Sequence, residues 1–159
     1  MEKIYLWECE NISSFNIHHL VKLKEIVCGE SGITDTAVNN FPESLEKINL
    51  RWCEKISDIN MHHLVNLKEI NCNDCSITNT AINSFPESLE RINLRCCKNI
   101  SAFNIQHLVK LKEINCSQTS IKDASLNKFP ESLEEIKLEI CKNISAFNIH
   151  HLVNLKKLG

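Results

Sequence analysis

Leucine recurs at one point of a 22-residue period along the whole chain. The leucines of this period are Leu23, Leu45, Leu67, Leu89, Leu111, Leu133 and Leu155. Each is followed by the same apolar frame, in which Ile48 and Leu50 alternate with the polar residues Asn49 and Arg51. This two-residue alternation is typical of a strand with one buried face. We therefore predict a solenoid of seven coils and the start of an eighth, with a strand opening each coil near residues 1, 23, 45, 67, 89, 111, 133 and 155.

A second period of 44 residues joins the coils in pairs. The hexapeptide Phe-Pro-Glu-Ser-Leu-Glu at 41–46 returns at 85–90 and at 129–134. A fixed period of this size indicates that one supersecondary unit is stacked along an axis. The proline of each copy ends a helix and admits the next strand. Positions 1–159 are thus expected to form a single repeat domain.

We expect a short helix on the outer side of every coil, after each strand. In the odd coils Ser13, Ser57, Ser101 and Ser145 stand where a helix N-cap is expected, and in the even coils Asp35, Asn79 and Asp123 do. Side chains of this kind satisfy free backbone N–H groups at a helix start. Each helix would be about two turns long and would need packing to be stable.

The apolar frame resembles the leucine-rich repeat, whose LxxLxLxx(N/C)xL segment forms a short parallel strand on a concave face. The coil containing Cys53 is similar to the cysteine-containing repeats found beside F-box domains. The Phe-Pro-Glu-Ser-Leu segment is similar to repeats of bacterial effectors and of amoebal or giant-virus proteins. The resemblance implies an α/β solenoid with a parallel concave sheet and convex helices. It also implies a scaffold that binds another protein without catalysis, in some cases as the target-recognition arm of a ubiquitin ligase or an effector.

Two columns of charge are expected on the neighbouring strands. The second position of each coil reads Glu2, Lys24, Glu46, Lys68, Glu90, Lys112, Glu134 and Lys156, and the third reads Lys3, Glu25, Lys47, Glu69, Arg91, Glu113, Glu135 and Lys157. Since parallel strands lie about 4.8 Å apart, opposite charges become neighbours except where Glu135 meets Glu113. We interpret the alternation as specifying the order in which the coils stack, because a slip by one coil would place like charges side by side. Copying of an arbitrary pattern by tandem duplication is the alternative.

Composition excludes several classes of function. The net charge is −2 and no basic stripe is present, so no nucleic-acid partner is expected. No apolar run approaches the length of a membrane span, and the first residues contain no apolar leader, so neither a membrane nor secretion is expected. An odd number of cysteines, nine, then favours a reducing compartment. We expect a cytoplasmic protein, or one inside a host cell if it is a secreted effector.

The cysteines and histidines repeat with the coils. Most cysteines fall at two inward positions and are interpreted as buried free thiols, whereas Cys96 falls outside them. A structural zinc site built from Cys72, Cys75, Cys96 and Cys97, or a disulfide, remains the alternative. The repeated histidines end in His19, His63, His107 and His151, which we expect to bind the backbone of the convex side, with a pH-sensitive surface role as the alternative.

The residues that break the repeat are the best candidates for function. No phosphate loop, GxSxG or HExxH motif is present, so neither an enzyme nor a cofactor is expected. We predict a partner-binding patch on the concave strands, and its residues are Tyr5, Trp7, Arg51, Trp52 and Arg95. Tyrosine, tryptophan and arginine are frequent binding hot spots, although tryptophans can also shield a neighbouring edge.

The ends of the chain suggest two further possibilities. The sequence begins within a strand at Met1 and stops at the opening of the eighth strand, with no polar cap at either end. The chain is therefore expected either to be part of a longer repeat protein or to pair end to end with copies of itself. The first of these possibilities includes the recognition arm of an enzyme.

Overall fold

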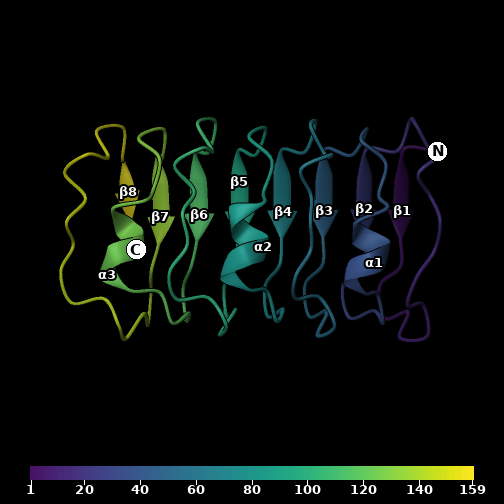
Figure 1. Cartoon of the computed structure of the whole chain (residues 1–159), viewed down its shortest axis with the longest axis horizontal. Coiled ribbons are helices and arrows are strands. Elements are labelled where there is room, and N and C mark those ends of the chain that lie inside the picture. The colour runs from purple at the N-terminus through teal and green to yellow at the C-terminus, as the bar shows by residue number, and fades with distance from the viewer.

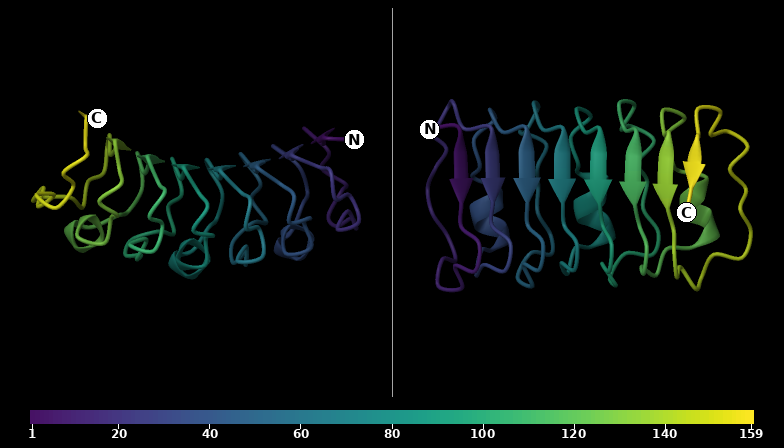
Figure 2. Two further views of the ribbon diagram at one scale, coloured as in Figure 1. Left: turned by 90° about the horizontal axis from the view of Figure 1, so that it is seen from above. Right: turned by 180° about the vertical axis from the view of Figure 1, so that it is seen from behind.

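A computed structural model describes all residues, 1–159, as one solenoid with a single parallel sheet. The sheet contains eight strands in chain order, which pair in register at offsets of 22 residues (Figure 1). The strands are β1 (Lys3–Tyr5), β2 (Glu25–Val27), β3 (Lys47–Asn49), β4 (Glu69–Asn71), β5 (Arg91–Asn93), β6 (Glu113–Asn115), β7 (Glu135–Lys137) and β8 (Lys157–Leu158). Figure 2 shows the coils along a shallow arc, with the strands on its inner side. The predicted solenoid of seven coils and the start of an eighth is confirmed.

The core is a continuous column of apolar side chains enclosed by the coils. The period leucines from Leu23 to Leu133 are fully buried, and the central isoleucine of each strand from β2 to β7 is nearly so. On the convex side Phe41, Phe85 and Phe129 are also buried. No coil could hold these residues away from water alone, so each coil depends on its neighbours for its core.

Helices form only in the even coils, which corrects the prediction of one in every coil. They are α1 (Asp35–Val38), α2 (Asn79–Asn83) and α3 (Asp123–Leu126), each about one turn long. The N-cap residues are Thr34, Thr78 and Lys122, one position before the expected ones. The odd coils cross the convex side without a helix.

Hydrogen bonds between coils involve two of the serines that were expected to begin helices in the odd coils. The side chain of Asp35 does not cap its own helix; instead it accepts bonds from the backbone N–H and hydroxyl of Ser57, at 2.9 and 3.0 Å. Asp123 accepts the same two bonds from Ser145, at 2.8 and 2.7 Å. Ser57 and Ser145 thus bond to the preceding coil, and neither residue begins a helix. These bonds also hold the pKa of Asp123 below its ordinary value.

Two further repeated side chains tie the coils together. The Nε2–H of His63, His107 and His151 donates to the carbonyl oxygen of a phenylalanine 22 residues earlier, at 3.1, 3.0 and 3.1 Å. This confirms the predicted role of these histidines on the convex backbone, whereas His19 makes no such bond. The serines of the hexapeptide were not expected to contribute. Their hydroxyls donate to the leucine carbonyl of the coil before at 2.7 Å, and these serines are Ser44, Ser88 and Ser132.

A tight turn follows each of the first seven strands and ends it after three residues. One residue of each turn has a positive φ, between 53° and 62°, although none of these residues is glycine: Glu8, Glu30, Trp52, Asp74, Cys96, Gln118 and Ile140. The backbone there is left-handed, a conformation that costs a side chain about 1–2 kcal/mol. The seven turns form one long edge of the solenoid, which we call the turn edge. No helix has the length and apolar character needed to cross a bilayer.

Candidate partner-binding surface

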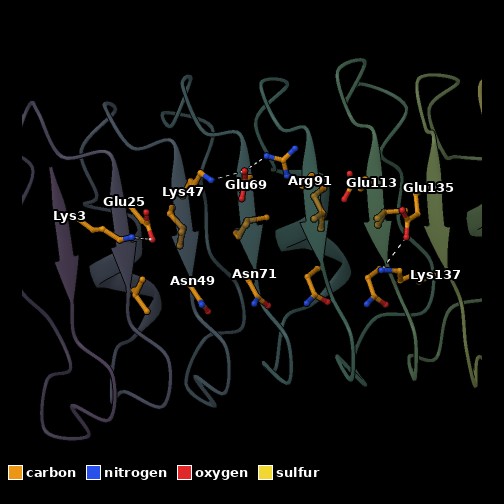
Figure 3. Close-up of a pocket in the computed structure, with 17 residues that line it drawn as sticks. Lys3, Glu25, Lys47, Asn49, Glu69, Asn71, Arg91, Glu113, Glu135 and Lys137 are labelled. Carbon is orange, nitrogen blue, oxygen red and sulfur yellow. Dashed lines mark hydrogen bonds and ion pairs between the residues drawn. The ribbon is translucent and has the colours of Figure 1, made fainter. Parts of the chain in front are cut away.

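The concave face is a shallow charged groove of about 570 Å³ that runs along the strands. Figure 3 shows most of its charged side chains in one row, and a second row that contains Asn49, Asn71 and Lys137. The asparagines support the fold, since each accepts the backbone N–H two residues later at 2.9–3.0 Å, and they are Asn49, Asn71, Asn93 and Asn115. The groove is therefore lined mainly by side chains that are already bonded within the protein.

Ion pairs join the charged columns across the strands. Glu46 lies between Lys24 and Lys68, at 2.9 and 2.7 Å, and hydrogen bonds from Lys68 and Lys24 lower the pKa of Glu46 to about 2. In the third-position column Glu69 bonds to both Lys47 and Arg91. The alternation does not produce a pair everywhere, because Glu90 and Lys112 form none.

The expected fault in the third-position column is present at β6 and β7. Glu113 and Glu135 are register partners, and Glu113 forms no ion pair. Glu135 is compensated by Lys137 on its own strand, at 3.1 Å, and by Lys157 of β8, at 3.0 Å. The role of Lys137 was not predicted, although its position supplies the signal, since asparagine occupies it in the four strands before.

The predicted patch lies mostly beside the concave strands and not on them. Tyr5 is in β1 as expected, 63% exposed, with the Nζ of Lys3 4.9 Å from its ring centre. The other predicted residues lie in the turn edge, because each strand ends before it reaches them. Those residues are Trp7, Arg51, Trp52 and Arg95.

Three residues of this patch form one cluster. The rings of Trp7 and Trp52 meet edge to face, with centres 6.1 Å apart, although the two residues lie two coils apart. Arg51 lays its guanidinium carbon 3.6 Å from the centre of the Trp52 ring. We call Trp7 and Trp52 the tryptophan pair. Arg95 is exposed in the equivalent turn two coils beyond Arg51, about 10 Å away, and so lies at the margin of this cluster.

Gly29 makes the tryptophan pair possible. It occupies the turn between those of the two tryptophans, and a Cβ at this position would lie 2.1 Å from an atom of the Trp7 indole. Any other residue would therefore displace the ring. Sequence reasoning did not identify Gly29, although the signal was present, since no other coil has glycine at this repeat position.

The cysteines form a ladder behind the turn edge. The thiols of Cys53, Cys75, Cys97 and Cys141 donate to a carbonyl 25 residues earlier, at 2.9–3.1 Å. Burial raises the pKa of Cys97 to about 12 and that of Cys116 well above its ordinary value. The predicted role of these thiols as buried donors is confirmed. Cys96 lies outside the ladder as expected, and its thiol contacts Oε1 of Gln118 at 3.5 Å.

Comparison with known proteins identifies the fold. No protein-family model matches the sequence, and no curated protein matches it. The internalin InlF of Listeria monocytogenes is similar in structure with a TM-score of 0.80 and 19% identity, over 99% of this chain and 47% of that protein. The functional domain of InlJ from the same organism, which includes a cysteine ladder, is similar with a TM-score of 0.67 and 17% identity, over 98% of this chain and 33% of that one.

A third similar structure is the internalin InlC2 of Listeria monocytogenes. Its TM-score is 0.63 with 18% identity, over 89% of this chain and 63% of that protein. The chain spans about half the length of InlF and a third of that of InlJ. The strand frame, the continuous parallel sheet and these similarities together show that this chain has the leucine-rich-repeat fold.

Proposed function

We propose that the chain is a non-catalytic scaffold that binds another protein on its concave side, with the tryptophan pair at the centre of the contact. The single observation that carries this proposal is the cluster of Trp7, Trp52 and Arg51. It is the one place where large aromatic side chains from different coils gather on the surface of the sheet side. Tryptophan and arginine at such positions account for much of the energy of many protein interfaces.

Burial supports binding over a purely structural role. Trp7 does cover the backbone of Gly29, as a shielding residue would. Each tryptophan nevertheless remains 37% exposed. The remaining surface of two large rings is apolar area that a partner could remove from water. Tyr5 extends this surface onto β1, and Arg95 extends it along the turn edge.

The groove itself supports binding over catalysis. Its charged side chains repeat from coil to coil, and Glu69 and Glu135 are held by neighbouring cations. An active site needs one constellation of acid, base or nucleophile that differs from its surroundings. The exposed departures from the repeat in the first three coils include two tryptophans and a tyrosine, which are suited to contact.

The experiment compares the wild type with a double variant, Trp7→Ala/Trp52→Ala. Proteins captured by the immobilised wild-type chain are identified, and their affinity for both forms is measured by calorimetry. We expect the double variant to bind at least about thirtyfold more weakly, as loss of a hot spot of about 2 kcal/mol implies. The matched control is Val65→Ala/Val109→Ala, which removes exposed apolar residues outside the turn edge. Equal binding by the wild type and the tryptophan variant would disprove the proposal.

A second candidate function is self-assembly through the end coils. The outer face of the first coil contains an open apolar recess of about 440 Å³ that includes Ile4, Leu6 and Phe15. Near the other end Phe147 and Leu158 are about half exposed. Stacking would pair β8 of one copy with β1 of the next. Light scattering over a hundredfold range of concentration tests this, and a constant monomer mass would exclude it.

A further inference from the structure

The turn edge around the tryptophan pair is acidic, and its carboxylates are not ion-paired. Glu8, Glu30 and Asp74 share one repeat position with Trp52. None of the three forms an ion pair, in contrast to Glu46 and Glu69 on the strand columns. Glu8 and Asp74 are exposed and Glu30 is half-buried, so all three can reach a partner.

Backbone hydrogen bonds place these groups in one column. The N–H of Glu8 donates to the carbonyl of Gly29 at 3.0 Å, that of Glu30 to Arg51 at 2.9 Å, and that of Trp52 to Asn73 at 2.9 Å. Consecutive turns therefore stack as the strands do, at a spacing of about 4.8 Å. The column reads Glu8, Glu30, Trp52, Asp74, and two carboxylates stand next to each other without a cation between them.

Arg51 forms no ion pair with the carboxylates of this column. Its guanidinium stacks on the Trp52 ring, and its Nε is buried without a hydrogen-bond partner. The arginine thus stiffens the tryptophan pair while the carboxylates beside it stay free. An aromatic surface flanked by free carboxylates attracts cations in two ways, through the ring faces and through direct charge.

The turn edge changes character farther along the solenoid. The last coils carry Arg95, Lys98 and Lys142 near the same edge, and these are basic. The negative charge is therefore concentrated in the coils that hold the tryptophan pair, although Glu139 lies in the last turn of the same edge. This coincidence of apolar rings and negative charge gives the surface a preferred kind of partner.

We propose that the tryptophan pair binds a basic segment of a partner protein, with lysine or arginine side chains placed over the rings and against Glu8, Glu30 and Asp74. The inference rests on the proposed function and specifies its partner. The four turns from Glu8 to Asp74 span about 15 Å, the length of four to five residues of extended chain. A segment with two basic residues a few positions apart can engage both ends of the column.

The test uses three synthetic heptapeptides in which leucine alternates with arginine, serine or glutamate. The chain has two tryptophans, so binding is followed through two indole N–H signals in proton–nitrogen NMR spectra. We expect the arginine peptide to shift both signals, and its affinity to fall as sodium chloride rises from 50 to 300 mM. The double variant Glu8→Gln/Glu30→Gln should bind the arginine peptide about tenfold more weakly than the wild type does, and its affinity for the serine peptide should be unchanged. The matched control, Glu43→Gln/Glu87→Gln, alters exposed carboxylates away from the turn edge and should have no effect.

The outcomes separate this inference from the proposed function. If the serine or glutamate peptide shifts the indole signals as strongly as the arginine peptide does, the basic preference is wrong while the tryptophan surface stands. Absence of any shift with the arginine peptide also overturns the inference. If a captured partner loses affinity for Trp7→Ala/Trp52→Ala but not for Glu8→Gln/Glu30→Gln, the proposed function holds and the charge requirement fails. Unchanged binding to both variants overturns both.

Discussion

The strand face, which is the concave sheet with its two charged columns, and the turn edge are built by the same stacking of coils. Charged side chains are mostly ion-paired on the strand face, whereas the carboxylates around the tryptophan pair in the turn edge are unpaired. On the strands Lys47, Glu69 and Arg91 alternate in sign and are bonded to one another. In the turn edge Glu8 and Glu30 are neighbours of the same sign without a cation. A strand side chain has a register partner on either side at about 4.8 Å, so its charge must suit both. Side chains of the turns project outward into water, where screening weakens such demands.

This difference indicates where residues can depart from the repeat pattern. A substitution on the strand face changes the charge that two neighbouring coils meet, whereas the turn carboxylates Glu8 and Asp74 are exposed and form no ion pair. The aromatic cluster lies in the turns, where departures from the repeat cost little. The inner side of the same turns is the cysteine ladder, which tolerates far less.

The largest effect is expected within the ladder. Cys97→Ala removes the thiol that donates to the carbonyl of Cys72 at 3.0 Å, so that this carbonyl keeps only its bond from the N–H of Cys75, and it leaves a cavity at a fully buried position. We expect the lost bond and the cavity to lower the free energy of unfolding by about 1–3 kcal/mol, measured by urea denaturation followed by circular dichroism. The adjacent Cys96→Ala is the control, because Cys96 lies outside the ladder and should change stability little. A similar loss in both variants would contradict the role given to the ladder.

A gain in stability is expected at the most strained turn. Ile140 is β-branched, 65% exposed and held at a φ of 61°, a conformation that glycine adopts freely. Ile140→Gly should therefore raise the free energy of unfolding by about 1 kcal/mol. Val153→Gly provides the comparison, since this exposed valine has no positive φ. The flexibility of glycine should therefore lower the free energy of unfolding of this variant. Destabilisation of both variants would show that the left-handed turn carries no strain.

A smaller effect is expected on the strand face. Glu69→Gln removes the charge that holds Lys47 and Arg91 together, and should cost about 0.2–1 kcal/mol for each pair lost. Glu113→Gln removes a carboxylate that forms no ion pair and faces Glu135, so stability should stay within about 0.3 kcal/mol of the wild type or rise slightly. Sodium chloride at 0.5 M should reduce the difference in free energy of unfolding between Glu69→Gln and Glu113→Gln. Equal losses at low salt would mean that the columns do not stabilise the stack.

The smallest effect is the contribution of one carboxylate to acid sensitivity. The pKa of Glu46 is about 2 in the folded chain against an ordinary 4.5, because Lys68 and Lys24 stabilise the charged form. Since the folded pKa is depressed, this stabilisation is complete above pH 4.5 and is lost as the pH falls toward 2. The urea midpoint of the wild type should thus fall more steeply than that of Glu46→Gln between these pH values. Glu43→Gln, at a position with no ion pair, should follow the wild type, and parallel curves for wild type and Glu46→Gln would refute the prediction.

Much of the architecture could be predicted because the repeat is short and its apolar positions allow only one face to be buried. The leucine period predicted each strand, and the charge columns predicted the fault between Glu113 and Glu135. The helices were only partly predicted. A serine before an apolar pair is an N-cap signal in isolation, but Ser57 and Ser145 are engaged by an aspartate of the preceding coil. Such a competition between coils is invisible to a local pattern.

The candidate surface shows the same limit. The sequence identified Trp7, Arg51 and Trp52 as departures from the repeat, and it predicted a concave patch. It did not predict that the strands stop before these residues, that Gly29 makes room for the Trp7 ring, or that the two rings meet. Each of these facts depends on where the backbone bends after a strand, and a three-residue strand ends too soon for periodicity to mark it.

The sequence alone determined the number of coils, the buried face of each strand and the order of charges along the sheet. These follow from spacing, since a fixed period forces equivalent residues into columns. Only the tertiary structure decided which coils form helices, which carboxylates find a cation and which aromatic rings touch. Those outcomes depend on contacts between residues that lie 20 to 45 positions apart in the chain, such as the tryptophan pair. The energy of such contacts depends on distance and direction in space, and a linear pattern contains neither.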